Sequence, residues 1–225
     1  MERFFDVLFS CFALLLIFPI FVPLVIILKF TGEGEVLYLQ ERIGKNGKLF
    51  KLFKFATMIK DSPNLGTGTV TVKNDPRVLP IGKFLRKTKI NELPQLLNIL
   101  LGDMCVIGPR PLTPETFNSY PDRIKVVIKQ VSPGLSGVGS IIFRGEESLM
   151  HGKTSSVEFY KKVIAPYKGQ LEEWFVNNKS LHVYFLAIFI TLWVVLFPKS
   201  NVAWTVFKEL PQPPEELKLA LGYKE

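Results

Sequence analysis

The feature that most constrains this fold is an uncharged apolar run of 22 residues, Val7 to Leu28. As a straight helix it would be about 33 Å long, which is enough to cross the hydrocarbon core of a membrane. Pro19 and Pro23 interrupt it past its middle, so a re-entrant helix broken near them is the alternative to a spanning one. The preceding residues MERFFD carry no net positive charge and no small-residue cleavage site follows, which argues against a signal peptide. We predict a membrane helix over residues 1–30.

A strongly basic segment follows. Between residues 42 and 89, acidic side chains occur only at Asp61 and Asp75, against twelve lysines and arginines. The whole chain has a net charge of +8 and a pI of about 9.4. Such a segment beside a membrane helix favours the cytoplasmic side, and it attracts anionic lipids and phosphates. Nucleic acid is disfavoured as a partner because no recognition module is present.

Cysteine and histidine are scarce, with two residues of each. A disulfide framework, a zinc site and a histidine-based triad are therefore excluded as the basis of the chemistry. Carboxylates, lysine, arginine and a hard metal ion remain.

The stretch from Arg86 to Pro111 predicts a helix that begins near Asn91 and ends at Gly102. Its predicted apolar face consists of Leu93, Leu96, Leu97, Leu100 and Leu101. Asn91 would be the N-cap, so Glu92 would lie in the first turn, where free N–H groups favour anions. Arg86, Lys87 and Arg110 flank this turn. The combination predicts a phosphate or diphosphate site.

The remaining patterns predict a mixed fold. An Asn46-Gly47 turn between alternating basic and apolar residues predicts a short hairpin. Helices are expected at 123–131 and 158–178. An apolar helix at 181–197, about 26 Å long, is at the lower limit for spanning a membrane, and lying in the interface or packing on the first helix are the alternatives. The glycine-rich segment 132–140 with Arg144 is expected to form a second arm of the anion site, and the tail 199–225 to be surface-bound or disordered. We predict a single membrane-associated domain of α/β or α+β class with amphipathic interfacial helices and a small sheet. Along the chain, we expect a membrane helix (1–30), a catalytic region (31–180), a membrane-associated helix (181–198) and a tail (199–225).

Several motifs together resemble the bacterial sugar transferases, the monotopic phosphoglycosyl transferases that begin glycan assembly. The motifs are FFD, RIGKNGKLFKLFKFATM, NDPRVLPIGKFLRKTKINELPQLLNILLGDM, IGPRPL and SPGLSG. The resemblance implies transfer of a sugar-1-phosphate from a UDP-sugar to undecaprenyl phosphate, with Mg²⁺ as cofactor. It also implies a re-entrant first helix, a catalytic domain on the cytoplasmic face of the inner membrane, and initiation of an exopolysaccharide, O-antigen, capsule or glycoprotein glycan.

The resemblance and the residue patterns together give the predicted site. Glu92 matches the family's metal-binding glutamate, and Pro109-Arg110-Pro111 matches the motif that holds the nucleotide. The predicted catalytic residues are Glu92, Asn91, Lys54 and Asp75; the predicted substrate-binding residues are Arg77, Arg86, Lys87, Pro109, Arg110, Pro111 and Arg144. The sequence leaves a homo-oligomer open and does not identify the sugar.

Three departures from the family pattern affect the mechanism. Asn91 replaces the family's nucleophilic aspartate, and an amide has no comparable nucleophilicity. Glu92 as nucleophile, direct transfer, another carboxylate such as Asp75, and weak activity are the alternatives. Ala56 replaces an arginine of the family, and the segment after Gly137 differs in the expected sugar pocket. A catalytically impaired relative that binds nucleotide-sugar or lipid phosphate in a glycan-assembly complex is the competing hypothesis.

Overall fold

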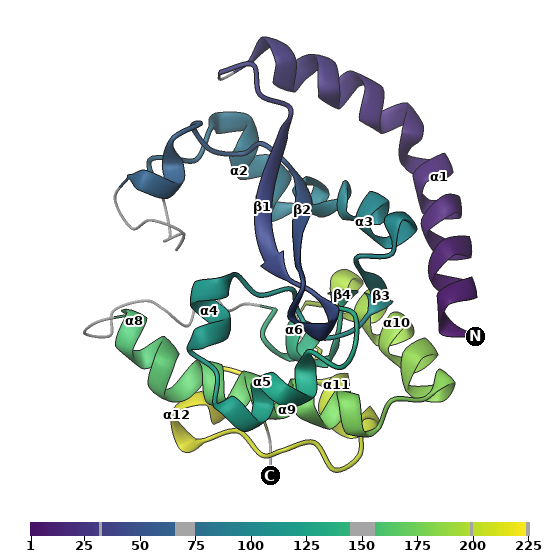
Figure 1. Cartoon of the computed structure of the whole chain (residues 1–225), viewed down its shortest axis with the longest axis vertical. Helices are drawn as coiled ribbons and strands as arrows, with labels where there is room; N and C mark the ends of the chain where they lie inside the picture. The colour runs from purple at the N-terminus through teal and green to yellow at the C-terminus, as the bar shows by residue number, and fades with distance from the viewer. Residues whose placement is uncertain (32, 66–74, 145–155, 199, 224–225) are drawn as a thin grey trace.

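The computed structural model describes residues 1–31, 33–65, 75–144, 156–198 and 200–223, and it begins with one long helix. Helix α1 runs from Glu2 to Phe30 and includes both Pro19 and Pro23 (Figure 1). In the described residues it is the one helix long and apolar enough to cross a membrane. The sequence favoured a break near the prolines, but the helix continues through both and its axis bends, as a helix can when proline removes single hydrogen bonds.

The first turns of α1 are attached to the rest of the molecule by polar contacts. Asp6 is buried and accepts hydrogen bonds of 2.8 Å from the backbone N–H of Val106 and from the hydroxyl of Tyr184. Arg3 donates to the carbonyl oxygens of Ile99 and Leu100 at the end of a later helix. Most of the remaining α1 surface is exposed and apolar, which suits a lipid environment.

A hairpin follows α1. Strands β1 (Leu37–Ile43) and β2 (Leu49–Phe55) pair antiparallel, from Leu37 opposite Phe55 to Ile43 opposite Leu49. The turn η1 (Lys45–Gly47) connects them, with φ of 58° at Asn46 and 75° at Gly47. Asparagine and glycine tolerate this left-handed conformation better than other residues. The predicted hairpin is confirmed.

The central stretch folds into short helical segments. They are η2 (Ser62–Asn64), α2 (Pro80–Lys87), the 3₁₀ turn η3 (Ile90–Glu92) and α3 (Gln95–Leu101). Gly102 ends α3 with φ of 95°, as expected. The predicted helix start is wrong, since α3 begins four residues after Asn91.

The predicted apolar face of α3 is also wrong in part. Leu96 is buried, but Leu97 and Leu101 are exposed, and Asn98 and Ile99 point inward instead. The amide of Asn98 explains this orientation, since it accepts from the N–H of Phe53 at 2.9 Å and donates to the carbonyl of Lys51 at 2.8 Å. It thereby satisfies the open edge of β2, which leucine cannot do.

The second half of the chain packs against a small parallel sheet. Strands β3 (Cys105–Ile107) and β4 (Gly134–Ser136) form that sheet. The helices around them are α4 (Pro114–Asn118), α5 (Asp122–Ile128), α6 (Val138–Ile142), α8 (Ser156–Phe159), the π-helical turn η4 (Tyr160–Ile164), α9 (Ala165–Asn177) and α10 (Leu181–Leu196). The helices predicted at 123–131, 158–178 and 181–197 are confirmed.

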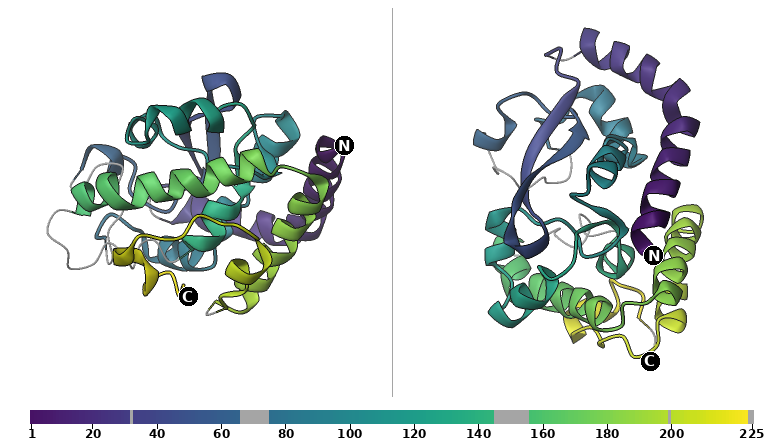
Figure 2. Two further views of the ribbon diagram at one scale, coloured as in Figure 1. Left: turned by 90° about the horizontal axis from the view of Figure 1, so that it is seen from below. Right: turned by 45° about the vertical axis from the view of Figure 1, so that its right-hand side comes forward.

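Helix α10 lies beside the first turns of α1, as both views in Figure 2 show. The rings of Phe5 and Phe185 meet edge to face with centroids 5.0 Å apart. Helix α10 also buries Tyr184, Ala187 and Ile190 in the largest hydrophobic cluster, against which Phe5 and Phe9 of α1 pack.

The C-terminal tail is not disordered in its described part. It contains α11 (Val202–Val206) and α12 (Glu215–Lys218), and it adds Ala203, Phe207 and Leu217 to the same cluster. These apolar side chains stabilise the tail by burial, so of the two alternatives for 199–225 the described residues support a surface-bound tail and not a disordered one. A helix-rich mixed fold with small sheets and one long apolar helix agrees with the predicted class.

Candidate active site

A cavity of about 510 Å³ lies between the β1–β2 hairpin, the C-terminal end of α2, η3 and the loop after β3. Its lining is mainly polar and basic at one end. The side chains used below are Arg42, Lys54, Arg86, Lys89, Asn91, Glu92 and Arg110, all of which line this cavity. The sequence placed five of them in the site: Lys54, Arg86, Asn91, Glu92 and Arg110.

Glu92 is the central acidic group of this basic cluster. Its Oε1 lies 3.6 Å from the Nζ of Lys54 and 3.6 Å from Nη2 of Arg110. The 3₁₀ turn η3 presents it, and Lys89 begins this turn with φ of 61°. A non-glycine residue in the left-handed region is a strained conformation that recurs at functional sites.

The electrostatic environment keeps Glu92 ionised. Burial by itself raises the pKa of Glu92, but the charges of Lys54, Arg110 and Lys89 outweigh this and lower the pKa to about 2. A carboxyl group with this pKa is negatively charged at neutral pH, so it can bind a cation but has no proton to donate.

The cations around Glu92 are crowded. Burial lowers the pKa of Lys54 to about 7, with Arg42, Arg110 and Arg86 contributing in the same direction against the opposing effect of Glu92. Burial and the charge of Arg110 lower the pKa of Arg42 to about 10. Because like charges are held together here, an added anion with two or more negative charges would relieve their repulsion.

Arg110 is carried by a loop, Gly108 to Pro111, that is bonded to several parts of the fold. The N–H of Gly108 donates to Ser136 (2.8 Å), and the carbonyl of Pro109 accepts from Gly134 (2.8 Å). A Cβ atom at Gly134 would lie 2.1 Å from the backbone nitrogen of Gly108, so this glycine allows the close approach. The glycine-rich segment thus supports the loop; its described residues do not form a second phosphate-binding arm.

Pro109 and Pro111 are not in the described lining of the cavity, and their role is to shape the backbone of this loop. Pro111 accepts a 2.9 Å hydrogen bond from Arg42, and Pro109 borders a small neighbouring depression. Their buried rings fix the path of the chain on both sides of Arg110.

Asn91 is buried at 7% exposure and lines the cavity. Its Oδ1 has no hydrogen-bond partner among the residues that the structure describes. The predicted capping role is wrong, because Pro94 occupies the N-cap position of α3. A buried carbonyl oxygen without a donor is costly to the fold, so this position calls for a functional explanation.

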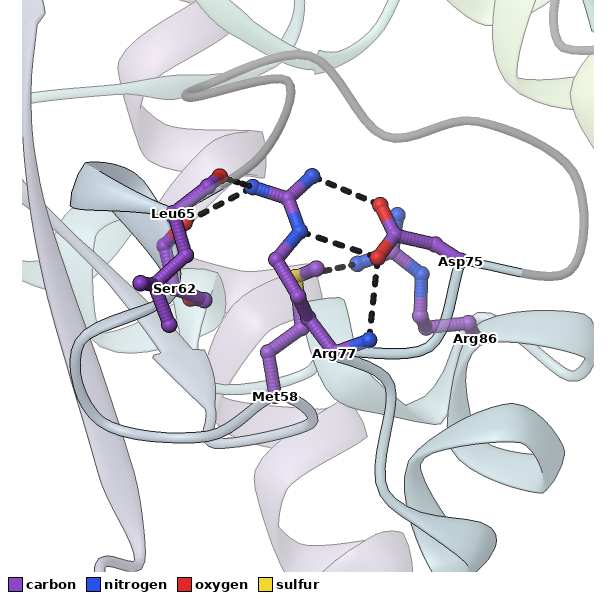
Figure 3. A network of polar contacts seen from close by, with 6 residues as sticks. All are labelled: Met58, Ser62, Leu65, Asp75, Arg77 and Arg86. Carbon is purple, nitrogen blue, oxygen red and sulfur yellow. Dashed lines mark hydrogen bonds and ion pairs between the residues drawn. The ribbon is translucent and has the colours of Figure 1, made fainter.

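Asp75 and Arg77 form a separate buried pair (Figure 3). The Nη2 of Arg77 lies 2.6 Å from Oδ2 of Asp75, and its Nη1 donates to the carbonyls of Ser62 and Leu65 at 2.7 Å. Neither residue is in the described lining of the cavity. Arg77 thereby holds the loop around η2, in which Ser62 lines the cavity, and the roles predicted for Asp75 and Arg77 stay predictions.

Two other predicted binding residues also lie outside this lining. Lys87 is exposed on α2, and Arg144 donates to the carbonyl of Val195 in α10 at 3.4 Å. Burial lowers the pKa of Arg144. Both were predicted from charge and order in the sequence, which do not fix their distance from Glu92.

Sequence reasoning assigned no role to Arg42 and Lys89 of the cavity lining, or to Glu172, which contacts the Arg110 loop from outside that lining. Arg42 shares the cavity face of the hairpin with Lys54, and the pairing of Tyr38 with Lys54 sets this geometry. The alternation of side chains along β1 could have identified Arg42. Glu172, which accepts a hydrogen bond from the N–H of Arg110 at 3.2 Å, had no local signal because it is 62 residues away.

The described residues contain no group of three or more histidine, cysteine, aspartate or glutamate side chains suited to a metal ion. Glu92 is one ionised carboxylate in a cavity large enough for a diphosphate. This set fits Mg²⁺, which commonly takes one or two carboxylates and completes its octahedron with water and substrate phosphates.

Comparison with known proteins agrees with this site. A family model described as bacterial sugar transferase matches residues 1–198. The exopolysaccharide production protein ExoY of Rhizobium meliloti is 39% identical over 161 residues, which cover 65% of this chain and 71% of that protein.

Two further relatives have names that state an activity. The UDP-glucose:undecaprenyl-phosphate glucose-1-phosphate transferase of Escherichia coli is 33% identical over 187 residues, 82% of this chain but 38% of that longer protein. A putative undecaprenyl-phosphate N-acetylgalactosaminyl 1-phosphate transferase of Bacillus subtilis is 38% identical over 133 residues, 59% of this chain and 74% of that protein. The match of the family model over most of the chain shows that this protein belongs to the bacterial sugar transferases.

Proposed function

We propose that this protein transfers a sugar-1-phosphate from a UDP-sugar to undecaprenyl phosphate and so begins the assembly of a glycan such as an exopolysaccharide. The observation that carries the proposal is the ionised Glu92 held between Lys54 and Arg110 in a basic cavity, in a chain with a membrane helix. The relatives named as undecaprenyl-phosphate sugar transferases support it, and they favour it over a catalytically impaired binding protein.

The reaction exchanges one phosphorus–oxygen bond for another. A phosphate oxygen of undecaprenyl phosphate attacks the sugar-bearing phosphorus of the UDP-sugar. The bond from this phosphorus to the oxygen of the uridine phosphate breaks, which releases UMP and leaves the sugar on undecaprenyl diphosphate. The attacking oxygen is already ionised, so the step depends on positioning and charge neutralisation more than on a proton acceptor.

The basic side chains of the cavity suit this task. Arg110 and Lys54 lie where they can bind the oxygens of the diphosphate, and Arg86 and Arg42 extend the positive field along the cavity. Their crowding, together with the pKa of Lys54 of about 7, means that a bound diphosphate would favour protonated Lys54. Preformed positive charge of this kind stabilises a transition state that carries charge on several oxygens.

Glu92 is the residue that would hold Mg²⁺. The ion, when bound, would neutralise diphosphate oxygens and orient the leaving UMP. Glu92 also keeps Lys54 and Arg110 close to one another before the substrate enters.

We infer direct transfer to the lipid phosphate, without a covalent enzyme intermediate. Asn91 cannot act as the family's aspartate does. Glu92 is engaged by two cations, and Asp75 is bonded to Arg77 outside the described lining. The unpartnered Oδ1 of Asn91 would then accept a hydrogen bond from a hydroxyl or amide of the substrate.

The proposed location is the cytoplasmic face of the inner membrane. UDP-sugars are made in the cytoplasm, and the basic segment beside α1 favours that side. Anionic lipid headgroups would contact the exposed lysines of this segment.

The test is UMP release by the full-length protein purified in detergent, with undecaprenyl phosphate, Mg²⁺ and a panel of UDP-sugars. We expect UMP and a lipid-linked sugar in equal amounts with at least one donor, and loss of both when EDTA is added. Folded protein that releases no UMP with any donor would overturn the proposal. UMP release without undecaprenyl phosphate would show a hydrolase instead.

A further inference from the structure

Glu172 is a buried carboxyl group that the proposed reaction does not use. It lies on α9 at 2% exposure, outside the described lining of the cavity. Its Oε1 accepts the hydrogen bond from the backbone N–H of Arg110, while its Oε2 has no partner among the described residues. The group therefore makes a single described hydrogen bond, and that bond goes to the loop carrying a cavity arginine.

The fold holds this carboxyl in place. A Cβ atom at Gly139 in α6 would lie 2.4 Å from Oε1 of Glu172, so a larger residue there would displace the carboxyl from its present position. The carboxyl is thus enclosed between α6, α9 and the loop from Gly108 to Pro111. A side chain fixed on three sides is able to fix the backbone group that it binds.

Among the residues that the structure describes, Lys168 and Arg110 are the charged groups that act on Glu172. Lys168 lies one turn earlier on α9 and is also buried, with its Nζ 5.4 Å from the ring centroid of Phe143. Arg110 is the charged residue of the loop from Gly108 to Pro111. Gly139, the neighbour of Glu172 on α6, has no charged side chain. Burial raises the pKa of Glu172 to about 7, against the opposing effects of the Arg110 hydrogen bond and of Lys168.

A carboxyl in this position is expensive as a packing element. Burying an ionisable group that makes one hydrogen bond costs free energy that a well-packed apolar side chain would not. A purely structural role therefore does not account for it, whereas control of the Arg110 backbone does.

We propose that Glu172 is a positioning residue for the transfer reaction, which acts by holding the backbone of Arg110 so that its guanidinium faces Glu92 and the diphosphate of the donor. This inference rests on the proposed function for the identity of the ligand. Glu172 does not touch the substrate itself.

The test measures UDP affinity by titration calorimetry in detergent, independently of turnover. The variants are Glu172→Ala, which removes the acceptor, Glu172→Asp, which withdraws it, and Glu172→Gln, which keeps a carbonyl oxygen in its place. We expect the first two to weaken UDP binding by about tenfold, the value of one hydrogen bond to a well-placed group, and Gln to stay within about threefold of wild type.

The decisive comparison repeats Glu172→Ala in an Arg110→Ala background. If Glu172 acts through the Arg110 side chain, its removal has no further effect there. Glu173→Gln is the matched control, because Glu173 lies next to Glu172 but pairs with Arg123 at 2.6 Å, and UDP affinity should not change.

Equal losses in both backgrounds, or unchanged affinity in folded Glu172→Ala, would overturn the inference. If Glu172→Ala does not fold, the Glu172→Asp and Glu172→Gln variants provide the test. The inference fails if Glu172→Asp binds UDP as tightly as wild type, or if Glu172→Gln binds UDP as weakly as Glu172→Asp. Because UDP binding needs no transfer, wild-type protein that binds UDP but releases no UMP would contradict the proposed function and leave this comparison intact.

Discussion

The Nζ of Lys54, at the end of strand β2, lies 3.6 Å from Oε1 of Glu92 in the turn η3. This pair joins two segments that are 38 residues apart in the sequence, and Arg110 completes it from a third. The contact is only partly exposed, so solvent screens it less than a surface ion pair.

Replacing Glu92 with glutamine is expected to lower kcat by about two to three orders of magnitude, the usual cost of removing one preorganised electrostatic group. The amide cannot neutralise Lys54 and Arg110, and it is a poor ligand for Mg²⁺. UMP release at saturating UDP-sugar measures the effect. Glu41→Gln, an exposed glutamate on β1, is the control and should retain wild-type activity. Equal activity in both variants would remove Glu92 from the mechanism.

Intact-mass spectrometry tests the role of Asn91. Wild-type protein mixed with UDP-sugar, but without lipid acceptor, is expected to gain no phospho-sugar. Asn91→Asp places a carboxylate at the same buried position of the cavity and is expected to gain the mass of one sugar phosphate, which peptide mapping would locate at residue 91. An adduct on Glu92 of the wild-type protein would contradict direct transfer.

The pH dependence of kcat/KM for the UDP-sugar should report on Lys54. Because burial lowers its pKa to about 7, the free enzyme loses this positive charge as the pH rises through 7. We expect kcat/KM to fall above pH 7, approaching tenfold per pH unit. In Lys54→Arg the charge persists, so the fall should move to higher pH. Superimposable profiles for the two proteins would assign the titration to another group.

Asn98→Ala is expected to reduce the free energy of unfolding by about 2–4 kcal/mol. The change removes two part-buried hydrogen bonds to β2 and takes away the partners of the Phe53 N–H and the Lys51 carbonyl. Denaturant unfolding in detergent measures it. Asn118→Ala, at an exposed position of α4, is the control and should change the stability by less than about 0.5 kcal/mol.

The elements that the sequence predicted well are those fixed by local chemistry. Asn46 and Gly47 determine the hairpin turn through their tolerance of positive φ, and Gly102 ends α3 for the same reason. The apolar composition of α1 and α10 identified both helices. In each case neighbouring residues carry all the required information.

The predictions that failed depend on contacts between distant segments. Leucine spacing alone could not show that Asn98 points inward, because the reason is an unpaired strand edge more than 40 residues earlier. The pairing of Asp75 with Arg77 was likewise not foreseen from the sequence, and their predicted roles in the site stay predictions. Glu172 reaches Arg110 only after α9 has packed against α6.

The attachment of α1 has a consequence for how the reaction must be measured. Arg3 bonds to the end of α3 and Asp6 to β3, so α1 is joined directly to the two elements that lie between Glu92 and Arg110 in the chain. If α1 lies in the lipid as proposed, this attachment would keep the site close to the lipid surface, and the proposed reaction would meet its acceptor by lateral diffusion in two dimensions. Its rate should follow the mole fraction of undecaprenyl phosphate in the micelle or bilayer, and adding inert lipid at constant bulk concentration should slow it.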